Sequence, residues 1–179
     1  MNAIMVVLLC ISLFCVTVKF GDESDAGPPA PAPEMEQLSA FCGTWDAEVE
    51  MMGQSSTGVE TCRVGIGGYW LVTDFEGTFM GAPFLGHGLT GFDPGAKTFT
   101  GIWVDSTGSP MAHLEDGRFS DDGKTYTALA GGLDFQGNPA RFRHTTRFLD
   151  ENARSFEVQQ VQEEGGEPVV MRISYKRKR

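Results

Sequence analysis

The side chains of this chain that are best suited to metal binding or proton transfer are three histidines, His87, His113 and His144. The turn sequences DPGA and STGSP predict two consecutive hairpins, and their registers place His87 opposite Ile102 and Ile102 opposite His113. The first two histidines would then share one face of the sheet, about 10 Å apart, with His144 on the other face.

A metal site usually needs a third ligand, and Glu115 is the nearest candidate to this pair of histidines. Ordinary polar or half-buried histidines are the favoured interpretation. Asp93 and Asp105 are explained by turn capping, and the chain has no G-x-S-x-G, H-E-x-x-H or P-loop motif. We therefore expect no metal, no cofactor and no catalytic residue.

Aromatic side chains recur in nearly every expected strand, and they are the strongest indication of a function. In a small barrel the inward aromatic residues either fill the interior or line a cavity for one small ligand. The candidate ligand-binding residues are Tyr69, Phe75, Phe99, Trp103, Phe142, His87 and His113.

The elements that must position these residues are strands. After Phe41 the apolar pattern has a period of two, and turn signals recur about every ten residues, which predicts about ten antiparallel strands between Thr44 and Arg177. An up-and-down barrel is favoured because closure removes exposed edges, with a two-sheet sandwich as the alternative. Glu34–Phe41 could form one or two helical turns, with Met35, Leu38 and Phe41 on one side.

The register of the first expected hairpin predicts how far apart Cys42 and Cys62 lie. If the turn is GQSS, Cys62 lies opposite Glu48, and Cys42 is about 20 Å away. A disulfide tolerates Cα separations of only about 4.4–6.8 Å, so this register predicts no Cys42–Cys62 bridge.

Several motifs resemble known families. Gly43-Thr44-Trp45 after a short helix resembles the G-x-W start of the calycin superfamily, which contains the lipocalins and fatty-acid-binding proteins. That resemblance implies that Gly43 and Trp45 close one end of a barrel, with a cation from the last strand stacked on Trp45. Arg172 is the cation that we assign, and Lys176 or Arg177 could also supply it.

A longer match covers nearly the whole domain. The ordered motifs G-T-W, G-G-Y-W, E-G-T-F-M-G-A-P-F, G-x-G-L-T-G-F-D and I-W-V-D-S resemble the bacterial family called domain of unknown function 1579. This resemblance implies a calycin-like barrel rather than any particular reaction. A haem-binding relative of the calycins uses a histidine near the C-terminal strands. Because residues 169–179 contain no histidine, the resemblance does not imply a haem site in this chain.

Composition and the N-terminal segment bear on location and partners. The net charge of −10 would repel a phosphate backbone, which excludes nucleic acid as a favoured partner. Residues 3–18 form an apolar run suited to an export signal, so residues 1–20 are expected to be a signal peptide or an N-terminal anchor. Residues 21–34 are expected to be a Pro/Ala-rich spacer, and residues 35–179 the barrel. The protein would be periplasmic or secreted, or tethered to the membrane if the leader is not cleaved.

Three functions are compatible with these patterns. The favoured one is a non-catalytic binder of a small apolar or amphipathic ligand. The first alternative is a small hydrolase or isomerase that uses polar lumen residues such as His87, His113 or Tyr69. The second is a solid-core structural or interaction domain. The binder and the enzyme both require an empty barrel interior, whereas the structural or interaction domain would have a filled one.

Overall fold

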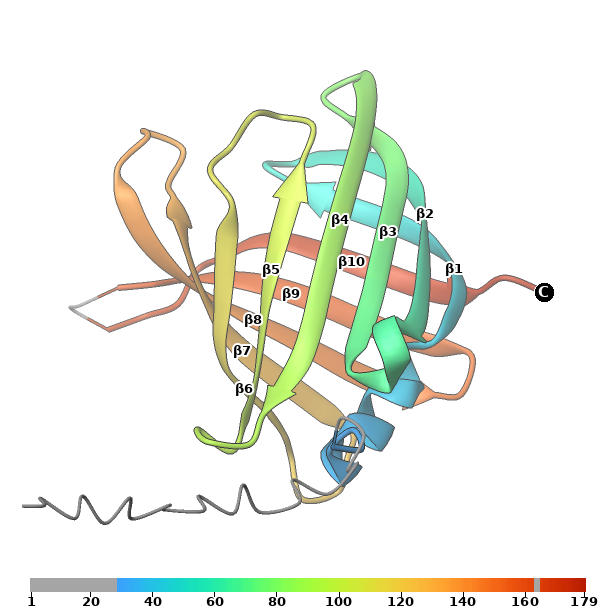
Figure 1. Cartoon of the computed structure of the whole chain (residues 1–179). Helices are drawn as coiled ribbons and strands as arrows, with labels where there is room; N and C mark the ends of the chain where they lie inside the picture. Colours follow the sequence, from blue (N-terminus) through green and yellow to red (C-terminus); the bar gives the residue numbers. More distant parts are fainter. Residues whose placement is uncertain (1–28, 163–164) are drawn as a thin grey trace, which may run out of the picture. The chain divides into compact units, whose positions relative to one another are not determined.

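The computed structural model of the chain describes residues 29–162 and 165–179. Contacts divide the chain into residues 1–30 and residues 31–179, and the second unit is the barrel (Figure 1). The expected leader and most of the expected spacer lie outside the described residues. Within that described part, none of the helices has the length and apolar character needed to cross a bilayer.

Ten antiparallel strands close into one barrel in the order β1-β10-β9-β8-β7-β6-β5-β4-β3-β2, which confirms the predicted fold and excludes the sandwich. Each strand pairs with its neighbours in the sequence, and β1 with β10 closes the sheet. The strands are β1 Gly43–Met51, β2 Gln54–Gly65, β3 Trp70–Phe79, β4 Ala82–Asp93, β5 Thr98–Asp105, β6 Ala112–Phe119, β7 Thr125–Leu133, β8 Pro139–Asp150, β9 Ala153–Val161 and β10 Val169–Arg177.

The predicted N-terminal helical turns are a 3₁₀-helix, η1, over Pro33–Phe41. Met35, Leu38 and Phe41 are its buried residues, as their spacing predicts, and they pack into a core cluster with side chains of the barrel. Since Leu38 and Phe41 also line the barrel interior, η1 closes one end of it (Figure 1). A second short 3₁₀ segment, η2, spans Ile66–Gly68 at the start of β3.

The first hairpin differs from its predicted register. Met51 pairs with Gln54, so the turn is Met52-Gly53 rather than GQSS, and Cys62 lies opposite Gly43 instead of Glu48. The φ angles of the two turn residues are positive, 53° and 73°. Positive φ at both central residues is typical of a type I′ turn, whose backbone twist matches that of the two strands it joins. The predicted separation of the cysteines was therefore wrong, although both thiols are free in the structure.

Candidate functional site

The inside of the barrel is hollow. A cavity of about 740 Å³ extends from Leu38 and Phe41 of η1 to the loops at the opposite end, where Ser109, Pro110 and Phe135 line it. This volume lies within the range of about 300–1,000 Å³ that small-molecule sites occupy. The hollow interior argues against the solid-core alternative.

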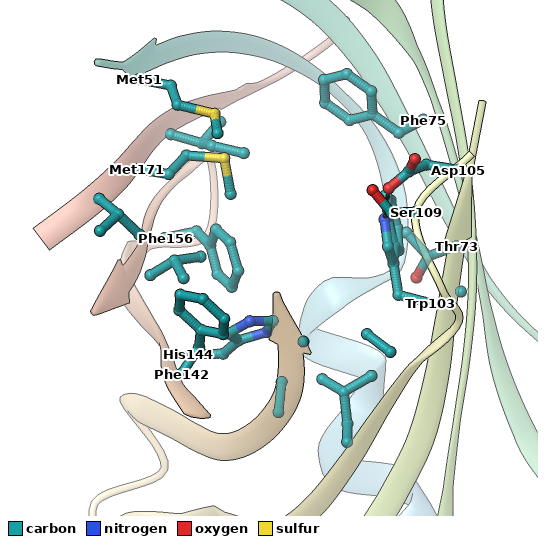
Figure 2. Close-up of a pocket in the computed structure, with 18 of the residues that line it drawn as sticks. Met51, Thr73, Phe75, Trp103, Asp105, Ser109, Phe142, His144, Phe156 and Met171 are labelled. Atoms are coloured by element: carbon teal, nitrogen blue, oxygen red, sulfur yellow. Dashed lines mark hydrogen bonds between the residues drawn. The ribbon is translucent and has the colours of Figure 1, made fainter. Parts of the chain in front are cut away.

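Two apolar walls face each other across the cavity (Figure 2). Met51, Met171, Phe142 and Phe156 lie on one side, and Phe75 and Trp103 on the other. Strand alternation brings these side chains inward, because every second residue of a strand points to the same face. The remaining wall is mostly aliphatic or made of small residues, so the cavity suits an apolar molecule.

Glycines in β4 make room for the indole of Trp103. Gly88 pairs with Trp103 across β4 and β5, and the ring lies over Gly86 and Gly88, where a Cβ atom at either position would press on it. Asp105 holds the ring in place, since Trp103 Nε1 donates a hydrogen bond of 3.2 Å to its carboxylate. A flat wall results, with the face of Trp103 against the lumen.

Replacement of Gly86 by alanine should displace the Trp103 ring, because the added Cβ would overlap it. We expect a loss of about 1–3 kcal/mol in the free energy of unfolding, as for other overpacked sites, together with a shift of the tryptophan emission. Gly131→Ala is the matched control, because nothing lies within 4 Å of its added Cβ. Urea unfolding followed by tryptophan fluorescence measures the free energy of unfolding and the emission of each variant. Equal stability of the Gly86→Ala and Gly131→Ala variants would contradict the close packing of Trp103 on Gly86.

A buried ion pair lies between the cavity and η1. Arg154 of β9 donates to the carboxylate of Glu60 in β2, and the Tyr175 hydroxyl donates to the other carboxylate oxygen at 2.9 Å. The Cys62 thiol completes the group, donating to Glu60 at 3.1 Å. All four side chains are buried.

Burial and the Glu60 charge set the ionisation of this cluster. Burial by itself would lower the pKa of Arg154, but the adjacent Glu60, Tyr175 and Cys62, with Glu60 the strongest of the three, together raise it. Burial raises the pKa of the Tyr175 phenol and of the Cys62 thiol, and the Glu60 charge adds to both shifts. The tyrosine and the cysteine are therefore neutral hydrogen-bond donors to a charged Arg154–Glu60 pair.

Trp45 closes the barrel end between two cations. The guanidinium carbon of Arg177 lies 4.1 Å from the Trp45 ring centroid, and that of Arg154 lies 4.7 Å from it. Gly43, at a φ of 129°, lets Arg177 Nη1 donate to the Cys42 carbonyl oxygen at 2.8 Å, because a Cβ there would overlap the guanidinium.

Trp45 and Gly43 lie at this end of the barrel, and the cation stacked on Trp45 is Arg177 and not the predicted Arg172. In β10 the buried Ile173 and Tyr175 face inward, so Arg172, between Met171 and Ile173, points outward, where it forms a surface ion pair with Glu157. Arg177 shares the inward face with Tyr175 and lies directly opposite Trp45 in the register. The alternation of β10 was the signal that could have selected it.

The sequence-predicted ligand residues separate into two groups. Phe75, Trp103 and Phe142 line the cavity. Phe99 is buried in the core cluster that contains η1, and Tyr69 lies in the turn after η2. Neither of these two is among the residues that line the cavity.

His87 and His113 do share one face, but it is the outer face of the barrel. His87 pairs with Val104, two residues from its predicted partner, and its Nδ1 lies 2.6 Å from an Asp74 carboxylate oxygen. His113 is exposed opposite Ile102. Their predicted place in the lumen is therefore wrong, because the inward residues beside them are Gly86, Gly88 and Ala112.

The histidine inside the barrel is His144. Its ring meets Phe156 edge-on, with centroids 5.3 Å apart, and it lies on the cavity wall (Figure 2). Across residues 29–162 and 165–179, no three histidine, cysteine, aspartate or glutamate side chains come together as metal ligands.

Sequence reasoning overlooked His144, Glu60 and Arg154 as residues of the lumen. His144 and Arg154 have the same parity as the apolar Phe142 and Phe156, so the alternation of β8 and β9 carried the signal for both.

Residues 30–177 match the family described as "Protein of unknown function (DUF1579)". The chain belongs to this family. No curated protein matches it.

Solved structures of low sequence identity are similar to this chain. Rv2717c from M. tuberculosis is 13% identical and has a TM-score of 0.58, and the match covers 83% of this chain and 99% of that one. The S-type phycobiliprotein lyase CPES from Guillardia theta is 10% identical, with a TM-score of 0.49, covering 80% of this chain and 92% of that one. At these identities the likeness to Rv2717c shows the fold alone, and this DUF1579 member is a closed ten-stranded barrel.

Proposed function

We propose that this DUF1579 protein binds one small, largely apolar molecule inside its barrel without chemically changing it. The observation that carries the proposal is the cavity of about 740 Å³ between apolar walls. Filling such a space with an apolar molecule removes the molecule and the walls from water, at about 25 cal/mol for each Å² of apolar surface buried.

The rim of the cavity adds support. Large apolar side chains are exposed in the loops opposite η1, where soluble proteins usually place polar residues, and they are Met52, Met80, Met111, Leu133 and Phe135. Phe135 is 53% exposed and also lines the cavity, so a bound molecule would cover part of it. Apolar groups concentrated at a cavity mouth are typical of a binding site.

The hydrolase or isomerase alternative has less support. The polar residues it relied on, His87, His113 and Tyr69, are not among the residues that line the cavity. Of the charged groups that do line it, Glu60 and Arg154 pair with each other, and the carboxylates of Asp105 and Asp134 each accept hydrogen bonds from nearby groups. His144 also lines it, but its ring contact is the apolar Phe156.

A neutral fluorescent dye, Nile red, tests the proposal. We expect it to bind one to one with a blue-shifted emission, and Ser56→Trp to weaken its binding at least tenfold, because Ser56 lines the cavity and an indole there would occupy it. Ser55→Trp changes the adjacent, exposed residue and should leave the affinity unchanged. The loss corresponds to about 1.4 kcal/mol of binding free energy or more. Circular dichroism checks that both variants fold; equal dye affinities, or no binding by the wild type, would refute the proposal.

A further inference from the structure

The His144 imidazole on the cavity wall has no hydrogen-bond partner in the described part of the protein. Among the described residues, no hydrogen bond or ion pair involves the His144 imidazole, whose protein contact is the edge of Phe156. Asp105 and Glu60, in contrast, accept hydrogen bonds from neighbouring side chains. Since the nitrogens of His144 are not among the enclosed atoms without partners, they face the lumen.

The surroundings of His144 are apolar on both sides. Ala128 of β7 and Val158 of β9 lie directly opposite it in the two registers. The titratable groups that face inward from these strands are Tyr126 on β7 and Arg154 on β9. Burial lowers the pKa of His144 to about 4, and no neighbouring charge contributes to that shift. The imidazole is therefore neutral at pH 7, with one N–H donor and one acceptor nitrogen.

The cavity also lacks a free cation for an acidic ligand. Of the described residues that line it, Arg154 is the one lysine or arginine, and its charge is already paired with Glu60. Its Nε is enclosed, without a partner, behind the rings of Trp45 and Tyr175. An anion in the cavity would meet a neutral ion pair and a neutral histidine, so the cost of its dehydration would not be offset.

We propose that His144 is the recognition point for a hydroxyl group on an uncharged, otherwise apolar ligand. This inference rests on the proposed function and specifies its ligand class as an apolar alcohol. A hydroxyl group both donates and accepts, so it complements the imidazole whichever nitrogen carries the proton. An unpaired imidazole between apolar neighbours binds an alcohol better than the corresponding hydrocarbon, because the hydrocarbon would displace water from the imidazole without replacing its hydrogen bond.

Competition with bound Nile red at pH 7.5 tests the inference with three probes of equal chain length: dodecan-1-ol, 1-chlorododecane and dodecanoate. In the wild type we expect the alcohol to bind about fivefold more tightly than the chloride, the value of one neutral hydrogen bond, and dodecanoate to bind most weakly. His144→Phe should remove the preference for the alcohol over the chloride.

Two further variants make the test specific. His144→Gln retains a donor and an acceptor and should keep part of the preference, whereas His113→Phe on the outer face should keep all of it. If Nile red binds but the alcohol and the chloride compete equally in the wild type, or if His144→Phe retains the preference, the role of His144 is refuted while the cavity remains a binding site. Failure of Nile red and all three probes to bind would refute both proposals.

Discussion

Glu60→Gln is expected to lower the free energy of unfolding by about 3–5 kcal/mol, the usual cost of breaking a buried ion pair from one side. The Arg154 side chain is 3% exposed and that of Glu60 9%, so water cannot replace the lost charge. Glutamine keeps the shape of the residue but leaves the guanidinium uncompensated beside Trp45 and Tyr175. The midpoint of urea unfolding at pH 7 measures the loss, with an unchanged m value as the sign that the transition is otherwise the same.

The matched control for Glu60 is an exposed pair. Glu115 forms an ion pair with Arg141 at 2.6 Å, with both side chains more than half exposed. Glu115→Gln should therefore cost no more than about 1 kcal/mol. The double variant Glu60→Leu, Arg154→Met removes both charges and should recover much of the loss, because apolar residues often replace a buried ion pair without cost. Equal effects of Glu60→Gln and Glu115→Gln would show that the buried pair does not stabilise the fold.

The second large effect concerns pH. Burial lowers the pKa of His144 from 6.5 to about 4. Between these two values the unfolded chain binds a proton at His144 and the folded protein does not. The stability contributed by this residue is therefore complete above pH 6.5 and is lost as the pH falls to 4, by up to about 3 kcal/mol.

His144→Phe should remove this part of the pH dependence. Unfolding midpoints at pH 7 and pH 4 should differ less in the variant than in the wild type, by up to about 3 kcal/mol of unfolding free energy. The comparison isolates His144, because the carboxylates that titrate in the same window are unchanged. His113→Phe, at an exposed position on the outer face, should keep the wild-type dependence. The same change in unfolding free energy between pH 7 and pH 4 in the wild type, His144→Phe and His113→Phe would contradict a neutral His144 in the folded protein.

Much of the architecture could be predicted from the sequence because it depends on local patterns. The period-two alternation and the turn residues indicate ten strands, and the spacing of Met35, Leu38 and Phe41 indicates the helical cap, as the structure confirms. The division of each strand into two faces was equally readable. In β8, Phe142, His144 and Thr146 alternate along the sequence with Arg141, Arg143 and Thr145, and all three line the cavity in the barrel.

Which of the two faces is the lumen was harder to predict in β4. A shift of two residues in the register left His87 on the same face, so that error did not matter. The inward positions beside it, however, are Gly86 and Gly88, which have no side chain to mark an interior. The outward Leu85 and Leu89 are the larger apolar residues of this part of β4, so its alternation does not mark the face of His87 as the outer one.

Local patterns could also not show which distant side chains meet. Glu60 and Arg154 are 94 residues apart, and only barrel closure brings β2 and β9 to opposite sides of one interior where the two charges can pair. The sequence by itself determined the strands, the helical turns before them and the two faces of each strand, because these follow from near neighbours. The tertiary structure alone decided that the barrel is hollow and that Glu60 meets Arg154 inside it, because these depend on how side chains from all ten strands share one enclosed volume.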